Sequence, residues 1–385
     1  MRELANHERI ELSVFFMTDT GLHEKYVKGY GETIKWDIPL LEGYGSRFLR
    51  NVSPTPNNNS FWSKINPGII SELRRGRFDA LVLHGYSSLT EWLALLAAKL
   101  SHIPVFFRGE VVRRAPGKWF PPKWLKEILL KSWCKRIDAA LTINSAAKDF
   151  YRYYGVPSER MFWAPYAVDN DFWKSKAAEL AGQKADWKKE FGLEPDLPVI
   201  IFVAHMRENK RPLDLIAAFE KIKTPASLLM IGAGPLYREV ADYCLQRGIK
   251  RVHLPGAKNQ TELPAYYAVS DVFVLPSGPG EVSPLVVNEA MCFGLPIILS
   301  DAIPSATDFV SFGQNGYIYK MGQVDELAAR IDAILADSET ARLMREESRK
   351  KIDEWHYEVS VGAIVQSLES VAGATDRTST TMRCG

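Results

Sequence analysis

The sequence contains no long apolar run and few cysteines. No stretch of its 385 residues approaches the ~18 consecutive apolar residues of a membrane-spanning helix, and the opening residues lack the apolar core of a signal peptide. Four scattered cysteines, at positions 134, 244, 292 and 384, show no metal-ligand spacing. The first three lie in apolar helical surroundings, so buried thiols are expected rather than disulfides. We therefore expect a cytoplasmic protein.

Strand and helix signals alternate along the chain. The 46% hydrophobic and 24% charged residues are those of a globular protein whose length suits two domains. Short apolar runs, each followed by helical spacing, predict an α/β fold with parallel sheets covered by helices. The runs are 79–85, 103–109, 138–144, 198–205, 226–234, 251–256, 271–277 and 295–301.

The alternation stops in a polar stretch between about 165 and 197, where we place the domain boundary. The first domain is predicted at 1–165 and the second at 166–354. A tail at 374–385 has no periodicity and few apolar residues, which predicts disorder.

Two glutamates flank a predicted helix start in PSGPGEVSPLVVNEAMCFGLPIILSD (276–301). Ser283 is a good N-cap and Pro284 suits the first helical position, which predicts a helix over 284–293. The free amides of Leu285 and Val286 would attract phosphate between Glu281 and Glu289. A nucleotide-sugar has both phosphates and hydroxyls for such a site. Alternatively, Glu281 only complements the helix dipole and Glu289 caps a neighbouring loop.

The same segment resembles the signature of retaining glycosyltransferases of family four, the glycosyl transferases group 1, which have two glutamates with seven residues between them followed by Ala-Met and Gly-x-Pro. The resemblance extends over most of the chain, at 153–173, 202–219, 230–240, 255–277 and 313–319. It implies the GT-B fold, in which two Rossmann-like doubly wound domains face a cleft. It also implies that a C-terminal helix at about 355–373 returns to the first domain.

The resemblance implies roles for residues of the second domain. Lys210 would hold the donor's diphosphate, and His205 falls where the family has a basic residue, with Arg207 nearby as a substitute. Glu289 would bind the ribose and Glu281 the sugar. The remaining donor-binding candidates are Leu285, Val286, Gly234, Ala257 and Lys258. Alternatively, Lys210 and Arg211 are solvated residues of a helix start.

Candidates in the first domain follow predicted strands. Arg108 stands near the place where many family members have a histidine beside the transferred sugar, and we take it as a catalytic candidate that Glu110 orients. His84 also ends a strand and is an acceptor-side candidate, although a structural role is the alternative. The first good strand is at 10–17, so the first domain is expected to lack its opening strand and helix, leaving the acceptor side incomplete.

A basic aromatic segment spans 108–136, with nine Lys or Arg against two Glu. It suits anionic lipid headgroups, which predicts peripheral contact with the inner membrane face; a solvated helix with its aromatics in the core is the alternative. No stacking-platform motif for nucleic acid accompanies it.

The predicted function is retaining transfer of a hexose-type sugar from a nucleoside-diphosphate donor, UDP or GDP, to a hydroxyl of a glycan, a lipid-linked saccharide or another cell-envelope or secondary-metabolite acceptor. No cofactor is expected. No catalytic metal is expected either, because Asp169 and Asp171 fall in the family's interdomain segment. A sugar-nucleotide epimerase or hydrolase, or a non-catalytic nucleotide-binding protein, is the alternative.

Overall fold

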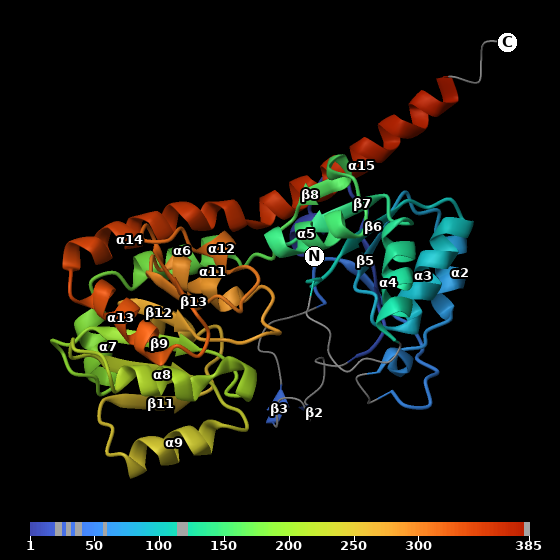
Figure 1. The fold of residues 1–385 in the computed structure, drawn as a ribbon. Helices are drawn as coiled ribbons and strands as arrows, with labels where there is room; N and C mark the ends of the chain where they lie inside the picture. The colour runs from blue at the N-terminus through green and yellow to red at the C-terminus, as the bar shows by residue number, and fades with distance from the viewer. Residues whose placement is uncertain (20–24, 28–31, 35–40, 57–59, 114–121, 381–385) are drawn as a thin grey trace. The chain divides into compact units, whose positions relative to one another are not determined.

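The computed structural model describes residues 1–19, 25–27, 32–34, 41–56, 60–113 and 122–380 (Figure 1). Contacts divide the chain into two compact units. Unit 1 comprises Met1–His23, Ile38–Pro165 and Tyr357–Gly385, and unit 2 comprises Glu24–Asp37 and Tyr166–His356. The division between Pro165 and Tyr166 falls at the boundary placed from the sequence.

Unit 1 is built on a parallel sheet of four strands in sequential order. They are β5 (Leu81–His84), β6 (Val105–Arg108), β7 (Ala139–Thr142) and β8 (Met161–Trp163). The connecting helices include α3 (Leu89–Leu100), α4 (Lys123–Cys134) and α5 (Ser145–Tyr153). The middle strands are apolar on both faces, as a covered parallel sheet requires, and Phe106, Phe107 and Leu141 are fully buried.

A short helix, α1 (Arg2–Ala5), precedes the first strand of unit 1. Strand β1 (Ser13–Phe16) pairs in parallel with β4 (Gly45–Phe48), and among the described residues this pair forms a sheet separate from β5–β8. The strand expected at 10–17 therefore forms, but over fewer residues. A separate antiparallel pair, β2 (Lys25–Val27) with β3 (Glu32–Ile34), falls within unit 2.

The long helix α15 (Tyr357–Thr380) belongs to unit 1. Its Ala363 and Ile364 pack in one core cluster with Leu4 of α1 and Phe106 of β6. The helix extends through 374–380, where the sequence predicts disorder, so that prediction is wrong for these residues. They contain no proline or glycine, and the helix propagates with one backbone hydrogen bond per added residue. Residues 381–385 lie outside the described residues.

Unit 2 is built on a six-stranded parallel sheet in the order β11-β10-β9-β12-β13-β14. The strands are β9 (Val199–Val203), β10 (Ser227–Ile231), β11 (Val252–Gly256), β12 (Val272–Leu275), β13 (Ile297–Ser300) and β14 (Gly316–Tyr319). The helices are α6 (Asn170–Glu179), α7 (Lys184–Glu190), α8 (Pro212–Phe219), α9 (Tyr237–Gln246), α10 (Leu263–Ala268), α11 (Leu285–Cys292), α12 (Ala306–Phe309), α13 (Val324–Leu335) and α14 (Ser338–Lys351). All eight apolar runs of the sequence contain a strand, and the prediction of an α/β fold with two Rossmann-like sheets is confirmed.

The strand order of unit 2 reverses at β9. From β9 the chain moves outward through β10 to β11, then returns to the other side of β9 with β12 and moves outward again. The loops that follow β9 and β12 therefore leave the sheet in opposite directions. In open α/β sheets ligands bind at such a reversal, outside the carboxyl ends of the strands.

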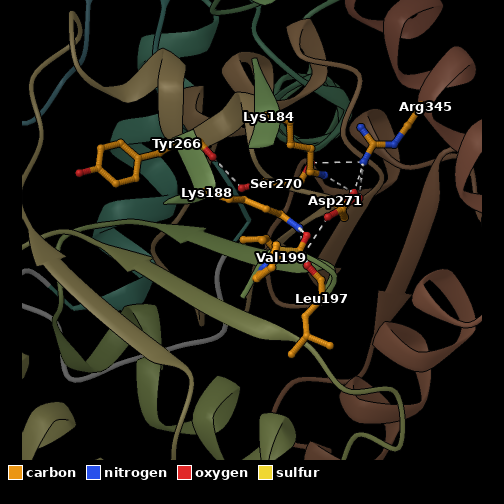
Figure 2. Close-up of polar contacts among 9 residues, drawn as sticks. Lys184, Lys188, Leu197, Val199, Tyr266, Ser270, Asp271 and Arg345 are labelled. Atoms are coloured by element: carbon orange, nitrogen blue, oxygen red, sulfur yellow. Dashed lines mark hydrogen bonds and ion pairs between the residues drawn. The ribbon is translucent and has the colours of Figure 1, made fainter. Parts of the chain in front are cut away.

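At the amino end of the same strands, Asp271 joins the sheet to two helices (Figure 2). Its carboxylate accepts from Lys184 Nζ of α7 at 2.7 Å and from Arg345 Nη2 of α14 at 2.8 Å. It also accepts from the backbone N–H of Val199 at 2.9 Å. Because one carboxylate serves three donors, this contact fixes the outer helices of unit 2 to the strands β9 and β12.

No helix in the described part of the chain is both long and apolar enough to cross a membrane.

Candidate functional site

The loop after β9 carries the predicted phosphate-binding residues. A short 3-10 turn at Glu208–Lys210 leads into α8, with Arg211 between them in the left-handed conformation at φ 52°. Arg211 Nε donates to Asp214 at 2.7 Å, a contact that holds this unusual backbone in place. The turn buries Lys210, which keeps only 8% of its surface exposed. The alternative, in which Lys210 is a solvated residue of a helix start, is wrong.

The loop after β12 meets the loop after β9 at the point of strand reversal. Lys210 Nζ forms an ion pair with the carboxylate of Glu281, whose side chain is also largely buried. The backbone N–H of Gly278 donates to the carbonyl of Asn209 at 2.6 Å. The structure thus brings together Glu281 and Lys210, two of the predicted site residues, although 70 residues separate them in the sequence.

Positive charge exceeds negative charge around this pair. Burial, and then the charge of Arg207, lower the pKa of Lys210 to about 8. The buried Nε of Arg207 has no hydrogen-bond acceptor among the described residues. Lys210 is thus paired with one carboxylate while a second cation, Arg207, acts on it, and such an arrangement favours an added anion.

Helix α11 begins one residue later than predicted. Pro284 has an extended ψ of 110° and is the N-cap, so Leu285 is the first helical residue; the N-cap prediction for Ser283 is wrong. The helix ends at Cys292, and Gly294 follows with φ 70°, the conformation for which glycine is favoured after a helix. The first-turn amides of Leu285 and Val286 have no intrahelical acceptor, and Leu285 is exposed.

Glu289 is buried on the inner face of α11, with 7% of its surface exposed. The hydroxyl of Tyr267, on α10, donates to its Oε2 at 2.8 Å. Burial raises the pKa of Glu289 to about 7, and this hydrogen bond opposes the rise. The observed partner of Glu289 is thus a helical tyrosine, not the neighbouring loop that the alternative interpretation proposed. Its binding of ribose stays a prediction.

The loop after β10 packs directly on the loop after β9. Gly234 has φ 138°, and a Cβ at this position would lie 2.6 Å from the carbonyl oxygen of Met206 and 3.0 Å from Cε1 of His205. Met206 N–H donates to Ala233 at 2.7 Å. Glycine is required here because the two backbones approach too closely for any side chain.

Ala257 and Lys258 follow β11, on the same carboxyl edge of the sheet. Lys258 Nζ lies 3.3 Å from Glu262 and 5.7 Å from the centroid of the Tyr266 ring. Tyr266 in turn stacks on Phe191 with 4.2 Å between ring centroids. All the predicted donor-binding residues therefore lie in loops or a helix start at the carboxyl edge of one sheet, except Glu289, which lies within α11.

Arg108 ends β6 in unit 1 and binds the backbone of the same unit. Its guanidinium donates to the carbonyl of Pro165 at 2.6 Å and to that of Ala164 at 3.0 and 3.2 Å. It also lies 3.4 Å from Ser360 Oγ of α15. The structure thus shows a role for Arg108 that the sequence did not reveal. Its guanidinium holds the segment that ends at Pro165 against α15. Its catalytic role stays a prediction.

His84 is the last residue of β5, and Glu110 lies two residues beyond the end of β6 and is exposed. Desolvation, and then the charge of Arg108, lower the pKa of His84. A histidine with a lowered pKa is neutral at pH 7 and can accept or donate a hydrogen bond. The roles of His84 and Glu110 on the acceptor side stay predictions.

The basic aromatic segment at 108–136 divides into buried and exposed parts. Trp133 is fully buried against Phe107 and Trp92, at centroid distances of 5.4 and 4.8 Å. On the outer side of α4, Trp124 is 64% exposed and Ile128 is 57% exposed. Lys131, Lys135 and Arg136 are also exposed. Residues 114–121 of this segment lie outside the described residues.

In the described residues no group of three or more His, Cys, Asp or Glu side chains could hold a metal ion. Asp169 instead caps α6, since its carboxylate accepts from the N–H of Phe172 at 2.9 Å. The Asp169/Asp171 spacing is thus explained by a helix start.

Residues 183–351 match the family model described as glycosyl transferases group 1. This part of the chain is similar to the glycosyl transferases group 1. The match covers most of unit 2, including both loops of the site, and the resemblance predicted from the sequence is confirmed.

Two curated relatives give the extent of the likeness. The sulfoquinovosyl transferase SQD2 of Arabidopsis thaliana is 26% identical over 348 residues, which are 86% of this chain and 65% of the relative. The N-acetyl-alpha-D-glucosaminyl L-malate synthase of Bacillus anthracis is 29% identical over 174 residues, which are 43% of this chain and 44% of the relative. The chain thus matches just under two thirds of the length of the first and under half of the second.

Among solved structures, Anabaena HepE in complex with UDP superposes with a TM-score of 0.68 at 15% identity, covering 85% of this chain and 87% of that one. A glycosyltransferase from Rickettsia africae gives a TM-score of 0.66 at 16% identity, covering 86% and 85%. At this level of identity the likeness shows the fold alone, and the fold of this chain is GT-B.

Proposed function

We propose that the chain is a retaining glycosyltransferase that moves a hexose-type sugar from a nucleoside-diphosphate-sugar to a hydroxyl acceptor. The observation that carries the proposal is the ion pair between Lys210 and Glu281 at the reversal of the strand order. It joins a cation suited to a diphosphate and a carboxylate suited to sugar hydroxyls at the edge where such sheets bind ligands.

Each group has a physical part in this reaction. Lys210 and Arg207 hold the diphosphate, and their charge stabilises the leaving group as the glycosidic bond breaks. The free amides at the start of α11 add partial positive charge to the same anion. Glu281 accepts from hydroxyls of the sugar, and Glu289 binds the ribose diol.

Retention follows when the acceptor attacks on the face from which the diphosphate departs. The departing phosphate oxygen then takes the acceptor's proton, so that no general base from the protein is needed. Under this scheme the rate depends on positioning and electrostatic stabilisation. The donor's nucleotide is UDP or GDP; the solved structures of Anabaena HepE include one with UDP-glucose.

We place acceptor binding in unit 1, at His84 and Glu110, with a glycan or lipid-linked saccharide as the acceptor. The exposed side of α4 and the residues just after it support contact with an anionic membrane surface, because Trp124 and Ile128 lie there together with three exposed basic side chains, one in the helix and two directly after it. Such a contact would bring a lipid-linked acceptor to the protein.

The first experiment is calorimetric titration of the full chain with UDP, GDP and ADP in EDTA, on the native protein and on Lys210→Met. We expect one nucleotide to bind the native protein and to lose most of its affinity in the variant. Release of nucleoside diphosphate from the sugar donor is then measured with and without candidate acceptors. Turnover without any acceptor would support an epimerase or hydrolase instead, and binding without turnover a non-catalytic protein.

A further inference from the structure

The phosphate-binding lysine of the free protein already has a negatively charged partner. Lys210 forms its ion pair with Glu281, and the two side chains keep only 10% and 14% of their surface exposed. Such a shielded pair is screened less by salt than a surface pair. Before any ligand binds, Lys210 is therefore a charged group that is shielded from water and paired with a carboxylate.

The diphosphate of a donor and the carboxylate of Glu281 would compete for the same ammonium group. An anion that reaches Lys210 comes close to Glu281, and two negative charges within a few ångströms repel each other strongly in a poorly solvated site. Arg207, whose charge also acts on Lys210, can attract the diphosphate, but a diphosphate bound to Lys210 would still lie beside the carboxylate of Glu281. One of the two anions must leave the ammonium group.

We infer that Glu281 is the internal counterion of Lys210 in the free protein and that the donor's diphosphate displaces it, so that the carboxylate becomes available to the sugar only after the diphosphate has bound. This inference rests on the proposed function of the same site. It makes Glu281 a residue with two successive partners, first Lys210 and then the sugar hydroxyls.

The exchange has two measurable consequences. Removing the charge of Glu281 removes the competitor, so diphosphate binding becomes tighter while sugar transfer becomes slower. A free sugar, which lacks phosphates, cannot release Glu281 and therefore binds only in the presence of the nucleoside diphosphate. If Glu281 bound only the sugar, removing its charge would slow sugar transfer but would not tighten diphosphate binding.

The test is calorimetric titration of the full chain with UDP, GDP and inorganic pyrophosphate in EDTA at pH 6.5, where Lys210 with its pKa of about 8 is protonated. The variants are Glu281→Gln and, as a control of equal charge change, Glu208→Gln, which alters an exposed carboxylate two residues before Lys210. We expect Glu281→Gln to bind the diphosphate at least about fivefold more tightly than the native protein. The affinity of Glu208→Gln for the diphosphate should stay within about twofold of the native value. This control distinguishes loss of the ion pair with Lys210 from a general loss of negative charge.

A double-variant cycle assigns the effect to Lys210. In the Lys210→Met background, Glu281→Gln should no longer tighten binding. If nucleotide binds the native protein and Glu281→Gln binds it equally or more weakly, the inference is overturned and the proposed function stands. If no diphosphate ligand binds either protein, both are overturned.

A second measurement is made on the native protein, and a variant is used only to assign the signal. The ¹³C signal of the Glu281 side-chain carboxylate, assigned by its loss in Glu281→Gln or by selective labelling, should shift when UDP or GDP is added. A signal that stays unchanged at saturating nucleotide would show that Glu281 keeps Lys210 as its partner, and would overturn the inference.

Discussion

The hydroxyl of Tyr267 donates to the carboxylate of Glu289 at 2.8 Å inside unit 2, where both side chains are buried. A single neutral donor does not replace the water that an ionised carboxylate loses on burial, and the pKa of Glu289 therefore rises to about 7. This carboxyl group is close to half protonated at neutral pH.

The first prediction concerns the pH dependence of stability. The folded-state pKa of Glu289, about 7, is above its unfolded value of 4.5, so stability is fully present below pH 4.5 and decreases as the pH rises toward 7. The loss amounts to about 3 kcal/mol at most. Glu289→Gln keeps the acceptor for Tyr267 and avoids the ionisation. Urea unfolding should show it to be more stable than the native protein at pH 8 but not at pH 4.5; an equal difference at both pH values would contradict this.

The second prediction concerns Asp271. Asp271→Asn leaves the charges of Lys184 and Arg345 without their carboxylate, and desolvation already lowers the pKa of each of these two groups. Unfolding free energy in urea should fall by about 3 kcal/mol. The control is Asp353→Asn, which removes an exposed partner of Lys174 and should cost less than about 1 kcal/mol. Equal losses of unfolding free energy in Asp271→Asn and Asp353→Asn would show that the three-donor contact stabilises the fold no more than an exposed ion pair does.

The third prediction separates two roles of Arg108. Lysine cannot reproduce the fork that binds the carbonyls of Ala164 and Pro165, so Arg108→Lys should destabilise the protein by about 1–3 kcal/mol. The control is Arg152→Lys, in an exposed pair with Asp149. Nucleotide affinity is measured alongside stability by calorimetry. A loss of affinity without a loss of stability would favour the predicted contact with the donor.

The fourth prediction concerns the close approach at Gly234. Gly234→Ala should lower both stability and nucleotide affinity, because the new Cβ would meet the carbonyl of Met206 and displace the loop after β9. Gly182→Ala is the matched control, since Gly182 also has positive φ, at 86°, but nothing lies within 4 Å of its Cβ position. Gly182→Ala should lower the unfolding free energy by about 1 kcal/mol and leave nucleotide affinity unchanged. Equal affinity losses in both variants would contradict the packing argument.

The fifth prediction concerns the exposed side of α4. The double variant Trp124→Ser/Ile128→Ser should bind vesicles with anionic headgroups at least about tenfold more weakly, because two apolar side chains no longer enter the interface. Leu245→Ser, in an exposed apolar position on α9, is the control and should bind as the native protein does. Co-sedimentation measures both. If the native protein did not bind anionic vesicles, the alternative interpretation would be favoured, in which α4 is a solvated helix without membrane contact.

The sequence predicts the strands of this fold better than the contacts of its site. Apolar runs such as 198–205 and 271–277 identify β9 and β12 because covered parallel strands must be apolar on both faces. No local pattern, however, shows that these two strands are neighbours. The resemblance supplied Lys210 and Glu281 as site residues without indicating that they pair with each other.

Other differences have equally local causes. Tyr267 lies 22 residues before Glu289, and only the folded structure, in which α10 and α11 both pack on α6, reveals it as the donor. The partners of Arg108 are backbone carbonyls, which carry no sequence signal of their own. The tail at 374–380 has a composition that predicts disorder, but a helix already formed by the preceding residues extends into it.

The order of synthesis gives α15 a further consequence. Unit 2 apart from 24–37 is one continuous stretch, Tyr166–His356, whereas the core of unit 1 combines Leu4 and Phe106 with Ala363 and Ile364. A ribosome makes the chain from its amino end, so unit 2 can fold while unit 1 still lacks its last helix. Unit 1 therefore begins before unit 2 in the chain but is completed after it, and the apolar surface of Leu4 and Phe106 stays uncovered by α15 until that helix has been synthesised.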